Sequence, residues 1–139
     1  MGARHSGRQA ALQMLFALDV AQGTSDMGRL MQDFWRNFEG DVEGRAYADA
    51  AAMGVFEKLG TIDTQIRTAS ENWRIERMAR VDRNILRLAT WELMHQTDVP
   101  KAVILDEAVE LAKAFGTEES PAFINGVLSR VATDLSRTS

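Results

Sequence analysis

The sequence predicts an all-α protein, folded as a bundle of about seven helices. The first observation is the segment 81–93, in which apolar residues form two adjoining stripes at helical spacing. A helix with two such stripes is buried around more than half of its circumference, so other helices must surround it. The second observation is that the other apolar segments also repeat at helical spacing, and that none alternates as a strand does. We therefore expect segment 81–93 to be the central rod of the bundle.

Three helices are predicted in the first part of the chain. They cover residues 4–22, 26–39 and about 42–59, and the first two end near Gly23 and Gly40. The third helix has small residues at mid-helix, which indicates the close approach of a neighbouring helix. Its predicted apolar stripe consists of Ala46, Ala50, Met53 and Phe56.

Four more helices are predicted in the rest of the chain, the first of them beginning after Gly60. Trp73 and Met78 flank the turn into the central helix, and both are predicted to be core residues. Asp98-Val99-Pro100 ends the central helix, because a residue before proline resists helical geometry. The following helix stops at Gly116. Ser120-Pro121 then starts the last helix, as a serine cap followed by proline in the first turn.

The composition is that of one globular domain with its own core. The chain has 139 residues, 45% apolar and 26% charged, which is ordinary for a soluble protein. It has no cysteine, which excludes disulfides, thiolate metal sites and a cysteine nucleophile and fits a reducing cytoplasm. We see no apolar run long enough to cross a membrane and no signal peptide.

Candidate catalytic groups are few. His5 and His95 are the two histidines, and neither has the spacing of a metal-binding pair. The carboxylate doublets 106–107 and 118–119 do not converge, because adjacent residues of a helix point about 100° apart. No phosphate-binding loop or dinucleotide motif is present. The sequence therefore predicts a protein that is not an enzyme and that uses no metal and no cofactor.

The charge pattern restricts how the protein could bind nucleic acid. The net charge is −4, so a nucleic-acid surface must be a local patch. Six of the sixteen basic residues cluster around the central helix: Arg67, Arg74, Arg77, Arg80, Arg83 and Arg87. An acidic group follows, comprising Asp106, Glu107, Glu110, Glu118 and Glu119. Charge runs of this kind are most often solvated helix faces.

Four motifs together resemble the NusB family of transcription antitermination factors. They are RQAALQMLF at 8–16, VDRNILR at 81–87, ILDEAVELAKAFG at 104–116 and FINGVL at 123–128. The resemblance covers essentially the whole chain, and residues 24–60 are its least typical part. It implies a single NusB-like RNA-binding domain, 1–139, of two packed sub-bundles: helices 1–3 at about 4–60 and helices 4–7 at about 61–136.

The resemblance also implies a function in the cytoplasm. Proteins of this family bind boxA-type single-stranded RNA in nascent transcripts, and bind it better together with NusE, a ribosomal small-subunit protein. In the RNA polymerase antitermination complex they support processive transcription of ribosomal RNA operons. No membrane partner is implied.

The site residues that the resemblance implies fall into two sets. The RNA-binding set consists of Arg4, His5, Arg8, Gln13, Phe16, Phe123 and Asn125. These types suit single-stranded RNA, which needs cations for phosphates and aromatic or amide groups for bases. The partner-binding set consists of Asp82, Arg83, Arg87 and Asp106. Two alternatives stay open: Phe16 as a core residue, and Asp106, Glu107 and Glu110 as internal partners of Arg83 or Arg87.

The N-terminal leader differs from the family pattern, in which more arginines are common. This leaves room for a protein–protein adaptor with little RNA affinity of its own. Another alternative is an RNA-guiding module related to that of ribosomal-RNA cytosine methyltransferases, although the chain shows no methyl-donor site. A homodimer that covers the RNA face is a further alternative.

Overall fold

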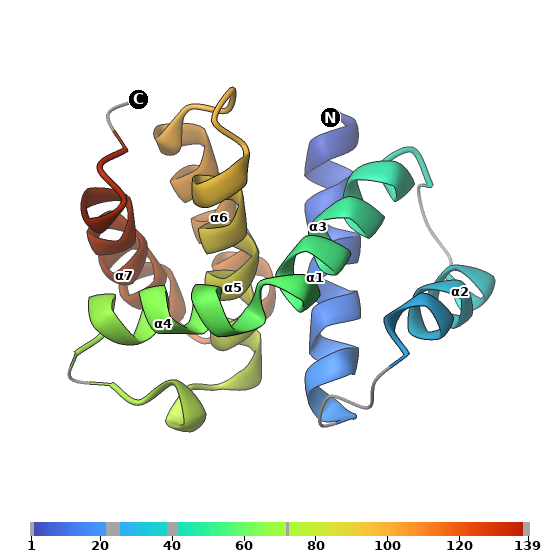
Figure 1. Cartoon of the computed structure of the whole chain (residues 1–139), viewed down its shortest axis with the longest axis horizontal. Coiled ribbons are helices and arrows are strands. Elements are labelled where there is room, and N and C mark those ends of the chain that lie inside the picture. Colours follow the sequence, from blue (N-terminus) through green and yellow to red (C-terminus); the bar gives the residue numbers. More distant parts are fainter. Residues whose placement is uncertain (1, 22–25, 39–41, 72, 138–139) are drawn as a thin grey trace.

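The computed structural model describes residues 2–21, 26–38, 42–71 and 73–137, and these form seven α-helices and one short 3-10 helix (Figure 1). The elements are α1 (Ala3–Val20), α2 (Met27–Asn37), α3 (Arg45–Glu57), α4 (Leu59–Ala69), η1 (Ile75–Arg77), α5 (Arg80–His95), α6 (Lys101–Phe115) and α7 (Ser120–Asp134). The described residues contain no strand. The prediction of an all-α fold with about seven helices is therefore confirmed.

Helix α5 is the centre of the bundle, as predicted from its two apolar stripes. It packs against α1, α3, α4, α6 and α7. Ile85, Leu86, Leu88 and Leu93 on this helix are almost completely buried. Because these side chains point in several directions around the helix axis, α5 supplies core to both sides of the molecule.

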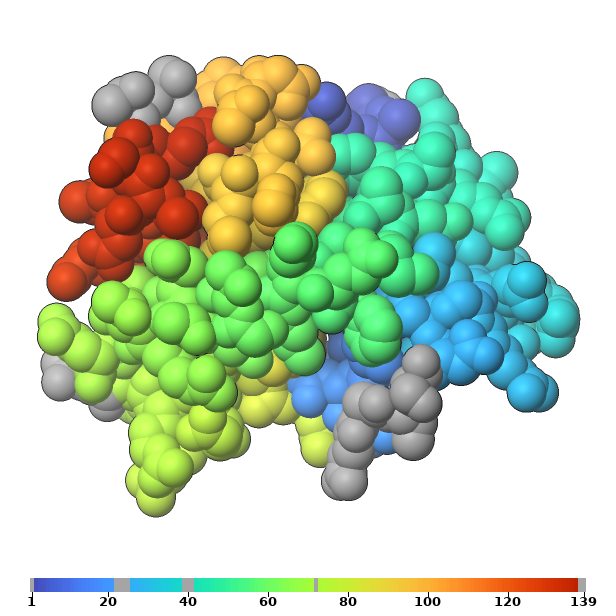
Figure 2. Space-filling model, in the orientation of Figure 1, coloured from blue at the N-terminus to red at the C-terminus, as the bar shows by residue number. Residues whose placement is uncertain are grey.

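The other helices lie on two sides of α5. Helices α1, α2 and α3 pack against one another on one side, and α4, α6 and α7 lie on the other (Figure 1). On the face shown in Figure 2, the side chains of α3 and α4 form a continuous band that joins the two groups. A single residue, Lys58, separates these two helices. Gly60, expected to end the third helix, lies in the first turn of α4.

Helices α1 and α3 approach closely, as the small residues of the third helix predicted. A Cβ on Gly7 would lie 2.9 Å from the Gly44 carbonyl oxygen, so the two backbones are nearly in contact. The predicted stripe is wrong in its first half only, because Met53 and Phe56 are partly buried and pack against the core. Ala46 and Ala50 are exposed, whereas the buried side chains are Ala48, Ala51, Ala52 and Val55. Alanine occurs on several faces of this helix, so the spacing alone does not select the buried one.

The turns between helices differ in part from the expectation. Met78 is buried as predicted, but Trp73 is 61% exposed, so its assignment to the core is wrong. The expected helix ends at Gly23 and Gly40 lie outside the described residues. Ser120 is the first residue of α7 rather than its cap, and its hydroxyl accepts a hydrogen bond from the Thr117 amide.

Neither a membrane span nor a metal cluster is found within the described ranges. None of the described helices is long and apolar enough to span a membrane. No group of three or more histidine, aspartate or glutamate side chains in these ranges is placed to hold a metal ion.

Candidate nucleic-acid interface

The first turns of α1 carry two of the predicted RNA-binding residues, Arg4 and His5. Arg4 is exposed and pairs with Asp98, 3.1 Å away in the loop after α5. Its guanidinium carbon lies 5.6 Å from the centre of the Tyr47 ring, which is a cation–π distance. The Nδ1 atom of His5 lies 2.9 Å from a carboxylate oxygen of Glu107 on α6. Both side chains therefore lie at the surface beside the protein's own acids.

Arg8 lies one turn further along α1 and is buried, with 4% of its surface exposed. Its Nε donates to both carboxylate oxygens of Glu92 on α5, at 3.1 and 2.9 Å. Its Nη1 donates to Glu107 at 3.0 Å, and the Tyr47 hydroxyl from α3 donates to Glu92 at 2.6 Å. We call Arg8, Tyr47, Glu92 and Glu107 the Arg8 network. Because carboxylates of the chain itself bind this guanidinium, it does not face a phosphate at the surface.

Two members of the Arg8 network, Arg8 and Tyr47, have shifted pKa values. Burial disfavours the charged guanidinium, but the hydrogen bond and charge of Glu92 outweigh burial, so the pKa of Arg8 is raised. Burial, followed by the Glu92 carboxylate, raises the pKa of the Tyr47 hydroxyl well above its ordinary range. Arg8 therefore remains a cation and Tyr47 a neutral donor near neutral pH.

Gln13 and Phe16 lie further along α1, three residues apart on one face. Both are at the surface, and Phe16 is 37% exposed. The alternative that Phe16 is a core residue is therefore wrong. Val20, one turn beyond Phe16, is 49% exposed, so an apolar strip continues along this face to the end of the helix.

Arg83 and Arg87, predicted to face a partner, bind carboxylates of their own chain. Arg83 pairs with Asp19 on α1 at 2.7 Å, and Arg87 binds both oxygens of Asp63 on α4 at 2.9 Å. Asp19 also accepts a hydrogen bond from Asn84 at 2.9 Å. Burial opposes ionisation of Asp19, but the hydrogen bonds from Asn84 and Arg83 prevail, and its pKa is lowered. These ion pairs tie α5 to α1 and α4.

The acidic residues of α6 are arranged differently from the expectation. Asp106 is exposed, and no described residue forms an ion pair with it. Glu107 belongs to the Arg8 network, and Glu110 pairs within its own helix. The alternative that these acids pair with Arg83 or Arg87 is therefore wrong, because both arginines are directed at carboxylates of α1 and α4.

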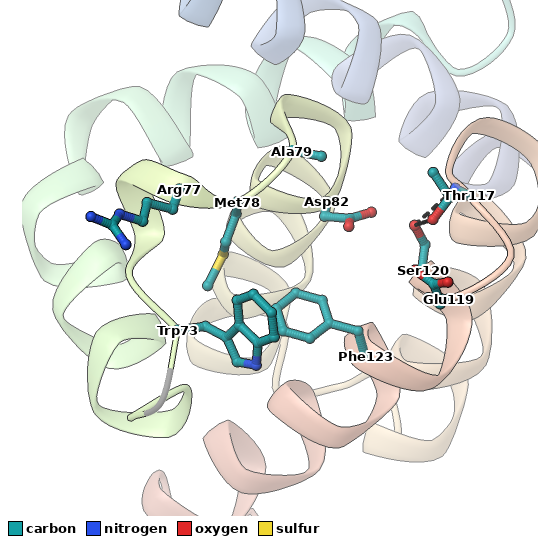
Figure 3. A pocket seen from close by; sticks show the side chains of 9 residues that line it. All are labelled: Trp73, Arg77, Met78, Ala79, Asp82, Thr117, Glu119, Ser120 and Phe123. Carbon is teal, nitrogen blue, oxygen red and sulfur yellow. Dashed lines mark hydrogen bonds between the residues drawn. The ribbon is translucent and has the colours of Figure 1, made fainter.

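Two of the remaining predicted residues, Asp82 and Phe123, line an open cavity of about 310 Å³, where η1 meets the first turns of α5 and α7 (Figure 3). We call it the aromatic pocket. Its main lining residues are Trp73, Arg77, Met78, Asp82, Ser120 and Phe123. The rings of Trp73 and Phe123 meet edge to face, with centroids 6.0 Å apart. In Figure 3 these rings lie on the side of the cavity opposite the Asp82 carboxylate.

The structure brings some predicted residues together and separates others. Phe123 and Asp82 share the aromatic pocket, whereas Asn125 is exposed and does not line it. Arg4 contacts the loop that follows α5, while Asp19, at the other end of α1, contacts Arg83 near the start of α5. Helices α1 and α5 are thus antiparallel. The leader and the aromatic pocket therefore lie toward opposite ends of α1.

Several residues of these sites escape prediction from the sequence. Tyr47 and Glu92 do so because their partners are distant in the chain: Arg8 and Glu92 are 84 residues apart. One signal is present, since Glu92 is a charged residue among apolar neighbours of the central helix and needs a buried partner. Trp73 carries no comparable signal, because an aromatic residue at a turn is typical of either core or surface.

Comparison with known proteins places this architecture in context. The profile of the NusB family matches residues 5–133. Two curated relatives are transcription antitermination proteins NusB. The protein from Sorangium cellulosum is 62% identical, with 99% of this chain and 96% of that protein aligned. The protein from Geobacter sulfurreducens is 50% identical, with 97% of each chain aligned.

Solved structures agree with this assignment. T. maritima NusB superimposes with a TM-score of 0.84 at 35% identity, covering 94% of this chain and 91% of that one. A chain from a crystal structure of antitermination factors NusB and NusE in complex with dsRNA gives a TM-score of 0.81 at 25% identity, covering 95% and 97%. The match of sequence and fold over nearly the whole chain shows that this protein belongs to the NusB family.

Proposed function

We propose that the protein is a transcription antitermination factor that binds boxA RNA together with NusE and supports processive transcription of ribosomal RNA operons. The observation that carries this proposal is the match to transcription antitermination proteins along nearly the entire chain. Similarity to a NusB chain solved with NusE and dsRNA supports both partners. We place its action in the cytoplasm, as one RNA-binding domain that binds without catalysing a reaction.

The surface of α1 supports an RNA contact. Arg4 and His5 supply positive or hydrogen-bonding groups near the start of the helix, and Gln13 and Phe16 supply an amide and an aromatic ring further along. Single-stranded RNA is bound by groups of these kinds, through its phosphates and unstacked bases. We assign Arg8 an indirect role: it holds α1 in position through the Arg8 network.

The charge of the chain supports a shared RNA site. With a net charge of −4 and few exposed cations on α1, the protein has little electrostatic affinity for RNA. A basic ribosomal protein would complement the acidic surface and add cations to the site. Asp82 and Asp106, which form no internal ion pair with a described residue, are the candidates to face it.

The test is fluorescence anisotropy of a labelled boxA RNA, titrated with this protein alone and then with equimolar NusE. We expect tight binding only when both proteins are present, and loss of that binding when the RNA sequence is scrambled. Equal binding of scrambled RNA, with no effect of NusE, would contradict the proposal.

A second candidate is a protein–protein adaptor with little RNA affinity, and the burial of Arg8 favours it by removing one cation from the leader. In that case NusE binds, but RNA affinity of the pair equals that of NusE alone. Whether the free protein forms a homodimer that covers the RNA-binding face is tested by light scattering, which measures its molar mass in solution.

A further inference from the structure

The exposed arginine at the start of α1 is already bound by a carboxylate of its own chain. The Nη2 atom of Arg4 donates a hydrogen bond to Oδ2 of Asp98 at 3.1 Å. Its guanidinium carbon also lies 5.6 Å from the centre of the Tyr47 ring, a cation–π distance. The side chains of Arg4 and Asp98 are 45% and 67% exposed, so a ligand can reach both of them. A ligand that approaches Arg4 therefore meets a cation that already has an anionic partner.

The loop that carries Asp98 is held in place by contacts of its own. Figure 1 shows this loop, between α5 and α6, at the same end of the molecule as the start of α1. The side chain of Val99 is buried, with 4% of its surface exposed. Arg137, after the end of α7, donates hydrogen bonds to the carbonyl oxygens of Val99 and of Leu93 in the last turn of α5, each at 2.7 Å. Because none of these contacts involves Arg4, the loop presents Asp98 to the arginine without depending on their ion pair.

A carboxylate and an RNA phosphate compete for the same guanidinium. Both are anions whose oxygens accept the N–H groups of arginine, often through two parallel hydrogen bonds. The hydrogen bond from Arg4 lowers the pKa of the Asp98 carboxyl below its ordinary value, so Asp98 is ionised at neutral pH. A phosphate that binds Arg4 must therefore displace Asp98 or approach against its negative charge.

Asp98 differs from the other carboxylate beside the start of α1. The Nδ1 atom of His5 lies 2.9 Å from Glu107, but Glu107 also binds Arg8 and belongs to the Arg8 network. A substitution of Glu107 would therefore change the stability of the protein as well as its surface. Asp98 forms an ion pair with Arg4 and with no other residue in the described ranges. Its substitution isolates the effect of the competing charge.

We propose that Asp98 competes with RNA for Arg4, as an autoinhibitory contact that occupies this arginine in the free protein. The contact lowers affinity for single-stranded RNA of any sequence, because Arg4 binds a phosphate and not a base. When NusE binds neighbouring phosphates, the strand is held close to α1, and the effective concentration of phosphate at Arg4 rises. The phosphate then displaces Asp98. This inference rests on the proposed function and adds a reason for weak RNA binding by the protein alone.

The experiment measures anisotropy of a labelled boxA RNA at low salt with NusE present. Asp98→Asn removes the charge and keeps the size of the side chain. We expect it to tighten RNA binding about two- to fivefold, the range that corresponds to loss of an exposed ion pair. In a protein that already carries Arg4→Ala, the same substitution should leave affinity unchanged, because the cation for which Asp98 competes is absent.

A matched variant controls for the change in net charge. Asp33 and Arg36 form an exposed ion pair on α2 at 3.2 Å. Asp33→Asn therefore removes one negative charge from a pair of the same kind, outside the residues assigned to RNA or NusE. It should leave RNA affinity unchanged.

Nuclear magnetic resonance of the free protein tests the ion pair itself. The pKa of the Asp98 carboxyl, measured from the pH dependence of its carbon-13 shift, should lie below the ordinary value in the wild type. In Arg4→Ala this pKa should rise, because the hydrogen bond from Arg4 lowers it. An Asp98 pKa that is the same in both proteins would overturn the proposal.

The other failures can be told apart. If boxA RNA binds with NusE but Asp98→Asn has no effect, or weakens binding, the competition is overturned and the proposed function stands. An equal gain from Asp33→Asn, or a gain from Asp98→Asn that persists with Arg4→Ala, reflects net charge and likewise overturns the proposal. If the wild type binds no boxA RNA with NusE, the proposed function fails, and the competition fails with it.

Discussion

Arg4 and Arg8 lie one helical turn apart on α1, but their surroundings differ completely. Arg4 pairs with an exposed aspartate, and both side chains remain in water. Arg8 is held between Glu92 and Glu107, and the Glu92 side chain is 2% exposed. At the residue scale, similar positions in the sequence therefore have different roles, one at the surface and one inside the molecule.

Replacement of Arg8 by alanine is expected to destabilise the protein. The substitution leaves the Glu92 carboxylate buried without its cation, which costs about 3–5 kcal/mol for a pair of this kind. Urea denaturation followed by circular dichroism measures the loss. Arg4→Ala is the matched control: it should leave the midpoint close to that of the wild type and weaken RNA binding. An Arg8→Ala protein as stable as the wild type would show that the Arg8 network contributes little.

Asp19 is expected to make stability depend on pH in the acid range. Its pKa in the folded protein is lowered by hydrogen bonds from Asn84 and Arg83, despite the opposing effect of burial. The stability that it contributes is therefore present above its unfolded pKa, about 3.9, and is lost as the pH falls through the lower folded value.

Asp19→Asn tests this dependence. At pH 7 the variant should be less stable by about 1.5 kcal/mol, the lower end for hydrogen bonds to a charged group. Below about pH 4 its difference from the wild type should shrink, because the Asp19 carboxyl of the unfolded chain then takes up a proton while that of the folded protein is still ionised. Asp106→Asn, at an exposed carboxylate, is the control. A difference that stays constant from pH 7 to pH 3 would exclude this role for Asp19.

At the scale of elements, glycine sets the distance between helices. Gly54 on α3 faces the indole of Trp91 on α5, and a Cβ at this position would overlap that ring. Gly126 lies inside α7, and a Cβ added there would extend into open space. The two glycines are both helical and differ in what surrounds them.

Alanine substitutions at these positions are therefore expected to have opposite effects. Gly126→Ala should stabilise the protein by up to about 1 kcal/mol, because alanine has the higher helix propensity. At Gly54 alanine has the same advantage in helix propensity, but its Cβ overlaps the ring of Trp91. We therefore expect the free energy of unfolding to fall by about 1–3 kcal/mol. Thermal unfolding of both variants measures the difference. Stabilisation by Gly54→Ala would mean that α3 and α5 separate at little cost.

At the scale of the whole molecule, net charge governs how RNA is bound. The chain carries −4, and in this structure the leader offers one exposed arginine, Arg4, to phosphates rather than three cations. The RNA affinity of the protein alone is therefore expected to depend weakly on salt concentration. A basic partner should make that dependence stronger.

The salt dependence of RNA binding tests this expectation. One phosphate neutralised by Arg4 corresponds to a slope of about −0.7 in log affinity against log salt concentration for single-stranded RNA. With NusE present the slope should become steeper, because more phosphates are neutralised. Anisotropy titrations at a series of potassium chloride concentrations give both slopes. A steep slope for the protein alone would reveal cations beyond those of the leader.

Much of the fold follows from local patterns. The stripes of segment 81–93 predict the central helix, and Ile85, Leu86 and Leu88 are buried there as expected. Local patterns do not predict burial where the same residues are compatible with more than one arrangement. The alanines of α3 fit more than one stripe, and the tryptophan at position 73 suits a core or a surface turn equally well.

Site residues depend more strongly on tertiary contacts. The family motifs predicted which positions to consider, and they are unable to show that Arg8 is buried while Phe16 is exposed. Both facts depend on which face of α1 meets α5 and α6. Ion pairing has the same limitation: Arg83 and Arg87 have several acids within plausible reach in the sequence, and the packing of α5 selects Asp19 and Asp63.

The sequence by itself determined the all-helical fold, the position of the central helix and membership of the NusB family, because periodicity and motifs are local properties of the chain. Only the tertiary structure decided that Glu92 is the partner of Arg8 and that Trp73, Asp82 and Phe123 line one pocket. Those arrangements join residues far apart in the chain. Helix packing, which no local pattern encodes, brings them within contact distance.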